Sequence, residues 1–132
     1  MSSLTVGDKV TDKKAGLSPI TMQEEYSKEL LISEAAQLMQ QVTNQWPDLV
    51  IDDISQTMCR AYEYRDGKVH TGEVRWHITV GSVTMGIAKQ VEIIFPVENG
   101  FLVTPETGRT PLGDEIPLES TAFSNWCRLG VK

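Results

Sequence analysis

The residue types that carry out most protein chemistry are few in this chain. It has two cysteines, Cys59 and Cys127, and two histidines, His70 and His77. The histidines are seven positions apart, about 23 Å along an extended strand, so they cannot share a metal ion unless the chain bends between them. These four residues lack the spacing of a zinc site. We therefore expect neither a metal ion nor another cofactor.

The sequence contains no recognisable catalytic pattern either. A nucleophilic cysteine needs a neighbouring base, but alternation in the surrounding segment places Cys59 on the core side of a strand, and Cys127 falls in a short expected helix. Packing is the simpler role for both thiols. Asp52 and Asp53 are adjacent and point to opposite sides of an extended chain, which makes a poor acid–base pair. We therefore expect a protein without catalytic activity.

Composition excludes several other classes of function. The chain has 132 residues, a single-domain length, and its 18 acidic and 12 basic side chains give a net charge of -6. An acidic domain repels the phosphate backbone, so we expect no nucleic-acid partner. No apolar run approaches the length of a membrane span, so we expect no membrane partner. The N-terminus has no signal-peptide pattern, which predicts a cytoplasmic protein, or one built into a particle, with reduced thiols.

One long helix is predicted over residues 21–46. Thr21 and Glu24 have the spacing of a capping box at its start. Pro47 disfavours helical geometry at Trp46, which places the end there. Between these limits, apolar residues recur at helical spacing and form one stripe: Leu31, Ile32, Ala35, Ala36, Leu38, Met39, Val42 and Trp46.

Three turn dipeptides predict an antiparallel meander after the helix. Asp66-Gly67 and Asn99-Gly100 are typical of type I′ hairpin turns, and Gly81-Ser82 fits a type II′ turn. The resulting strands lie near 54–65, 68–80, 83–98 and 101–105. The first turn predicts the pairs Arg60–Glu73, Glu63–His70, Cys59–Val74 and Thr57–Trp76; the second predicts Val80–Val83, Ile78–Met85 and Trp76–Ile87; the third predicts Val97–Leu102.

Period-two alternation along these strands predicts which face is buried. On the second strand the apolar row is Val74, Trp76, Ile78 and Val80; on the third it is Val83, Met85, Ile87, Val91, Ile93, Phe95 and Val97, interrupted by Lys89. Lys89 fits either a bulge or an edge position from which its ammonium reaches solvent. With the helix covering this face, the fold class is α+β: one long N-terminal amphipathic helix packed on a four-stranded antiparallel β-meander.

Both ends of the chain are expected to be arms. Residues 1–20 are polar and lack a sustained period, and residues 106–132 contain two of the three prolines that recur six residues apart, Pro105, Pro111 and Pro117. Proline keeps such a segment extended. A short helix is predicted over 120–129, with Phe123, Trp126 and Cys127 on one face. The sequence leaves open whether the arms pack on their own domain or on a neighbouring chain.

Two surfaces are candidates for contact with another protein. From Ala35 to Pro47 the helix carries no charge, although charged side chains are usual on a solvated face, and the expected outer face of the sheet is small and neutral at its centre. Uncharged surface is cheaper to desolvate when a partner binds. The candidate interface residues are Gln37, Gln40, Gln41, Asn44, Met58, Tyr62, Tyr64, His77, Thr84, Gly86, Ala88, Ile94, Phe123 and Trp126.

Three hypotheses of function remain from the sequence. The first is a non-catalytic assembly subunit that associates with itself or docks in a larger assembly, of which a virus or phage particle is one example. The second is an acidic antagonist of the immunity-protein type that binds a basic site, suggested by the net charge and by Asp114, Glu115 and Glu119. The third is a small-ligand or enzymatic pocket between helix and sheet, lined by Tyr62, Tyr64, Trp76 and His77.

Overall fold

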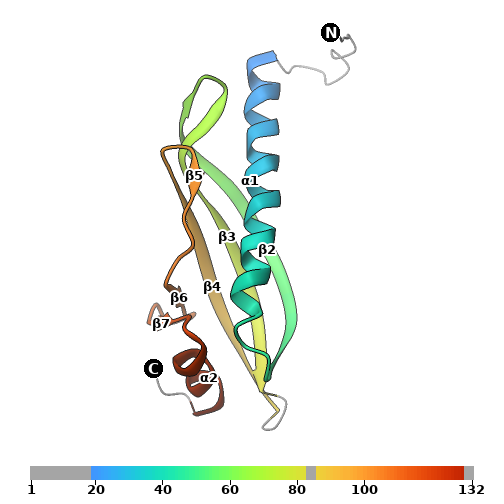
Figure 1. Cartoon of the computed structure of the whole chain (residues 1–132), viewed down its shortest axis with the longest axis vertical. Helices are drawn as coiled ribbons and strands as arrows, with labels where there is room; N and C mark the ends of the chain where they lie inside the picture. Colours follow the sequence, from blue (N-terminus) through green and yellow to red (C-terminus); the bar gives the residue numbers. More distant parts are fainter. Residues whose placement is uncertain (1–18, 83–85, 130–132) are drawn as a thin grey trace.

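The computed structural model of the chain describes residues 19–82 and 86–129, and it has the predicted α+β architecture (Figure 1). The arm expected over residues 1–20 lies almost wholly outside this described part. Within it, a six-stranded sheet has the order β2-β3-β4-β6-β7, with β5 paired to β4. The elements are α1 (Pro19–Thr43), β2 (Leu49–Arg65), β3 (Lys68–Ser82), β4 (Ile87–Glu98), β5 (Phe101–Leu102), β6 (Thr107–Arg109), β7 (Glu115–Pro117) and α2 (Ser120–Leu129).

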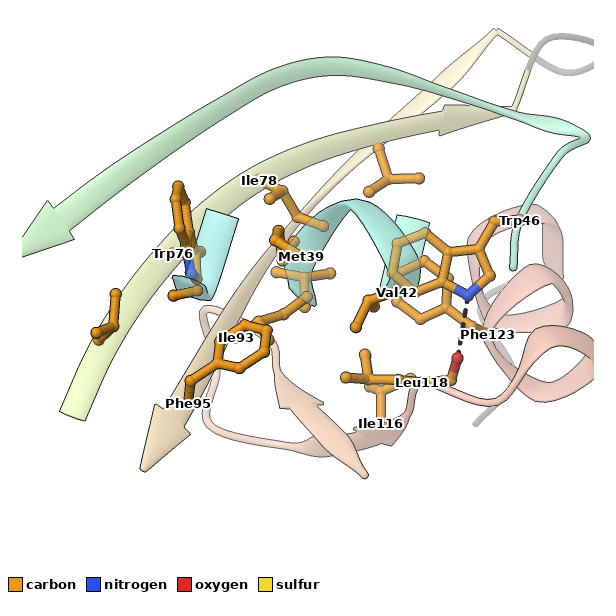
Figure 2. Close-up of a cluster of buried hydrophobic side chains, with 14 of the residues drawn as sticks. Met39, Val42, Trp46, Trp76, Ile78, Ile93, Phe95, Ile116, Leu118 and Phe123 are labelled. Carbon is orange, nitrogen blue, oxygen red and sulfur yellow. Dashed lines mark hydrogen bonds between the residues drawn. The ribbon is translucent and has the colours of Figure 1, made fainter. Parts of the chain in front are cut away.

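Helix α1 packs its apolar stripe on one face of the sheet, and the long strands curve around it (Figure 2). The helix begins at Pro19, so Thr21 lies inside it and is not the N-cap that the sequence predicted. Proline suits the first helical position because its missing N–H has no partner there in any case. The helix ends at Thr43, three residues earlier than expected. The buried members of the stripe are Leu31, Ala35, Met39, Val42 and the post-helical Trp46, whereas Ala36 is exposed.

The first hairpin has the predicted turn and much of the predicted register. Asp66 and Gly67 both have positive φ, as a type I′ turn requires, and Arg60–Glu73 and Cys59–Val74 are paired. Two expected pairs are wrong. Glu63 pairs with Thr71 instead of His70, and Gln56 pairs with Trp76 in place of Thr57. The cause is a series of bulges, which the period-two rule cannot anticipate.

The second hairpin differs from its predicted position. Strand β3 continues through Ser82, and Trp76 pairs with Ile93 instead of Ile87, a displacement of six residues. Gly81-Ser82 is therefore strand and not the predicted turn, and β4 begins at Ile87. The other two expected pairs are wrong as well, because Val80 pairs with Lys89 instead of Val83 and Ile78 pairs with Val91 instead of Met85. Because six is an even number, the shift keeps each strand's buried face, and the apolar rows of β3 and β4 meet as predicted.

The C-terminal segment folds back on its own domain. Residues 107–109 form β6 and residues 115–117 form β7, and these two short strands pair with each other. On the side of β4 away from β3, β6 pairs with β4 through Arg109 and Glu92. Gly108 permits this approach, because a Cβ there would lie 2.7 Å from Val91 Cγ1. The predicted α2 follows, with the bounds expected. Lys89, on the core face, extends its ammonium over the Trp126 ring at 5.2 Å, so it occupies a snorkelling position.

Trp46, just after the end of α1, contacts the C-terminal segment of the chain (Figure 2). Its indole stacks on Phe123 of α2, with ring centroids 3.9 Å apart and an interplanar angle of 17°. Its Nε1–H donates a hydrogen bond of 3.0 Å to the backbone carbonyl of Leu118. Both rings are buried. One side chain therefore fixes the turn after α1, the segment after β7 and the start of α2.

We predict that Trp46→Phe lowers the free energy of unfolding by about 2 kcal/mol, because the buried Leu118 carbonyl loses its donor. Trp76→Phe is the matched control. Trp76 is buried too, but its Nε1–H has no hydrogen-bond partner, so this substitution leaves no carbonyl unpaired. Urea unfolding of both variants measures the difference. Equal losses of stability would show that the Trp46 hydrogen bond does not contribute.

Candidate interaction surface

The sheet has one covered face and one open face. Both described helices contribute to the single core cluster on the covered face. We call the opposite side the outer face; it is formed by Met58, Arg60, Glu73, Arg75, His77, Thr79, Gln90, Glu92 and Ile94 of β2, β3 and β4. These residues are exposed or half-buried, and neither described helix packs over them. The sheet alone positions their side chains.

A chain of polar contacts crosses the outer face. The Arg75 guanidinium donates to the Glu73 carboxylate through Nε and lies 3.5 Å from Glu92 Oε2 through a terminal nitrogen. The same Glu92 oxygen is 2.9 Å from His77 Nε2. The Glu73 and Glu92 side chains are only 12% and 19% exposed. The result is a rigid, largely satisfied network in the middle of the face.

The network holds Glu73 in its ionised form. Burial alone would raise the pKa of Glu73, but hydrogen bonds from Arg75 and Tyr62, together with the positive charges of Arg75 and Arg60, lower the pKa below its ordinary value. The hydrogen bond to Glu73 in turn raises the pKa of the Tyr62 hydroxyl. Tyr62 is thereby tethered while 60% of its surface stays exposed.

The geometry gives little support to acid–base or nucleophilic chemistry. The Ser55 hydroxyl donates to the backbone carbonyl of His77 at 3.3 Å, so the imidazole does not activate it. Burial raises the pKa of the Cys127 thiol to about 11 and also raises that of Cys59, which keeps both thiols protonated at neutral pH. No set of three metal-binding side chains comes together within residues 19–82 and 86–129.

A groove of about 650 Å³ adjoins the network on the outer face. The loop after β6 forms its wall, and Leu112 at the tip of that loop is 91% exposed. The groove floor mixes both signs of charge, from Asp53, Glu92 and Arg109. A smaller hollow of about 420 Å³ lies between the first half of α1 and the β2–β3 turn, beside the exposed Tyr26.

The predicted interface residues fall into three groups. Those on the open surface are Gln37, Gln40 and Gln41 of α1, Asn44 in the turn after it, Met58, Tyr62, His77 and Ala88 of the sheet, and Gly86 in the turn before β4; Ile94 is half-buried on the outer face. Thr84 lies outside the described residues. Three placements are corrected: Tyr64, Phe123 and Trp126 belong to the covered side.

The physical reasons for these corrections differ. The bulge at Tyr62 changes which side the following residues face, so Tyr64 packs against the core and hydrogen-bonds Lys28 of α1. Phe123 and Trp126 are 0% and 7% exposed because α2 closes one end of the core instead of covering the outer face. They are therefore not available to a partner in this structure.

Sequence reasoning missed the network as a unit. The predicted register of the second hairpin was displaced by six residues, so it did not bring Arg75 and His77 of β3 next to Glu92 of β4. The observed register sets His77 directly opposite Glu92. A comparison of the charge pairs that each alternative register creates could have found the network, because cross-strand pairs of opposite charge stabilise a sheet.

Comparison with known proteins gave no match to any family model, curated protein or solved structure. No helix within the described residues has the length and apolar character needed to cross a membrane. The outer face and the β2 edge are therefore interpreted from their own geometry.

We predict that Glu73→Gln destabilises the protein by about 1 kcal/mol at pH 7, because it replaces a charged acceptor of two hydrogen bonds. The folded-state pKa of Glu73 is depressed, so its contribution is present above the unfolded-state pKa of about 4.3 and is lost as the pH falls through the folded-state value. The difference from wild type should therefore shrink in acid. Thermal unfolding between pH 7 and pH 3 measures it, with the exposed Glu98→Gln as control. A difference independent of pH would contradict this account.

Proposed function

We propose that this chain is a non-catalytic assembly subunit that associates with further copies of itself in a larger protein assembly. The observation that carries the proposal is the position of exposed apolar side chains around the open face. Met58 and Tyr62 of β2 are 44% and 60% exposed, and Phe101 at the start of β5 is 75% exposed. A single-sided sheet gives these groups no cover within the described part of the chain, and burying them on a partner is favourable.

The chemistry of the surface supports a protein partner. Tyrosine and arginine are enriched in protein interfaces, where they combine large contact area with hydrogen bonding. Here Tyr62 and Arg75 are already held by Glu73, so little side-chain entropy is lost when a partner binds. The uncharged flank of α1 offers a second surface of low desolvation cost. Two surfaces on one subunit would suit a repeating assembly such as a virus or phage particle.

The alternatives receive less support. Of the three acids that suggested an antagonist, Glu119 accepts hydrogen bonds from the backbone N–H groups of Thr121 and Ala122, which lower its pKa, so it serves as a cap of α2. The space between helix and sheet, where a ligand pocket was expected, is filled by core side chains that include Trp76. The large groove lies on the opposite side of the sheet.

We predict a discrete multimer of the 14.7 kDa chain in light scattering over a concentration series. Met58→Glu should weaken association about tenfold, because it places a charge in the buried contact. Leu30→Glu on α1 is the matched control, since Leu30 is 48% exposed but lies away from the outer face. A monomer at every concentration would overturn the proposed self-association and would favour the acidic antagonist.

A further inference from the structure

Strand β2 is a long free edge of the sheet. It stands at one end of the strand order, and within the described residues no strand pairs with its other side. Its 17 residues therefore present a row of unpaired backbone groups. Such an edge can accept a strand from another chain. Ile54 and Met58, near its middle, are each 44% exposed.

The charges on β2 are arranged antisymmetrically. Asp53 and Arg60 flank the uncharged segment 54–59, and neither forms an ion pair within the described residues. The Arg60 guanidinium makes a weak contact of 3.8 Å to Met58 Sδ, and its charge acts on Glu73 of β3 without an ion pair to it. An antiparallel copy of the same strand would bring the acidic end of each β2 against the basic end of the other.

A bulge gives the two charged side chains the orientation that such pairing needs. Directly opposed residues of an antiparallel pair point to the same face. In a regular strand, Asp53 and Arg60 are seven positions apart and would point to opposite faces. The bulge at Thr57 removes this mismatch: Asp53 pairs with Thr79 and Arg60 with Glu73, and both partners lie on the outer face.

We propose that a second copy of this chain pairs with β2 in antiparallel register about a two-fold axis perpendicular to the sheet. Asp53 then lies opposite the partner's Arg60, Ile54 opposite the partner's Cys59, and Ser55 opposite the partner's Met58. In each of these pairs the two residues share a face. The pairing continues the sheet across two subunits and covers the exposed Ile54 and Met58 at its centre.

The bulges of β2 are compatible with this pairing. Bulges commonly protect an edge by twisting it away from a partner. Here they fall at Asp52, Thr57 and Tyr62, five residues apart and symmetric about Thr57. The two-fold axis of the proposed register passes between Gln56 and Thr57, so the central bulges of the two copies lie next to each other and the outer bulges are offset by one residue. The same bends disfavour addition of a regular, unrelated strand, which favours a second copy as the occupant.

This inference rests on the proposed self-association, and charge reversal tests it separately. Asp53→Arg and Arg60→Asp should each weaken dimer formation about tenfold in sedimentation equilibrium at low salt, because each places like charges opposite one another. The double variant, Asp53→Arg with Arg60→Asp, should restore the wild-type dissociation constant. Glu29→Arg on the exposed side of α1 changes the net charge by the same amount as Asp53→Arg and should have no effect.

A cross-linking experiment tests the register. Mixed chains carrying Ser55→Cys and Met58→Cys should form a disulfide-linked heterodimer, because opposed side chains lie about 5 Å apart in an antiparallel pair. A mixture of Ser55→Cys and Val50→Cys should not. If the wild-type chain is a monomer, the proposed function and this interface both fail. If a multimer persists in both single reversals and no cross-link forms, this interface alone is wrong.

Discussion

The buried contact between Trp46 and the C-terminal segment is the constraint on which the rest of the fold depends. Helix α1 ends before Trp46, and β2 begins three residues after it. The indole therefore lies at the connection between the helix layer and the sheet layer. Stacking on Phe123 and the hydrogen bond to Leu118 bring residues more than seventy positions away to the same point. This contact closes one end of the core, beside which β6 pairs with β4 and β7 pairs with β6.

Because both helices are used on one side, the other side of the sheet has to be stabilised without a covering layer. A polar network across three strands contributes to this stabilisation by pairing charges. It runs from Tyr62 through Glu73, Arg75 and Glu92 to His77. Isolated surface ion pairs contribute little, but a connected network with half-buried carboxylates is more rigid. The apolar side chains around it, Met58, Tyr62 and Phe101, stay exposed.

The edge strand illustrates how a local irregularity can have a larger consequence. Each bulge in β2 interrupts the pairing with β3 by one residue. The bulges bend the strand, and the one at Thr57 assigns Asp53 and Arg60 to one face, which a regular strand of the same sequence would not do. Register, curvature and charge pattern are therefore coupled in this element, and the proposed pairing of two copies depends on all three.

The sequence by itself determined the class of fold, the apolar stripe of α1, the bounds of α2 and two of the three turns. These features are local: Asp-Gly and Asn-Gly favour the positive φ that is found at residues 66–67 and 99–100, and a helical or alternating period needs only neighbouring residues. The buried faces of β3 and β4 were also predictable, because the error at Gly81-Ser82 displaced the register by an even number of residues. Only the tertiary structure decided that register, the bulges of β2 and the packing of α2 under Trp46. Each of these minimises a free energy summed over contacts distant in the sequence, which no local pattern contains.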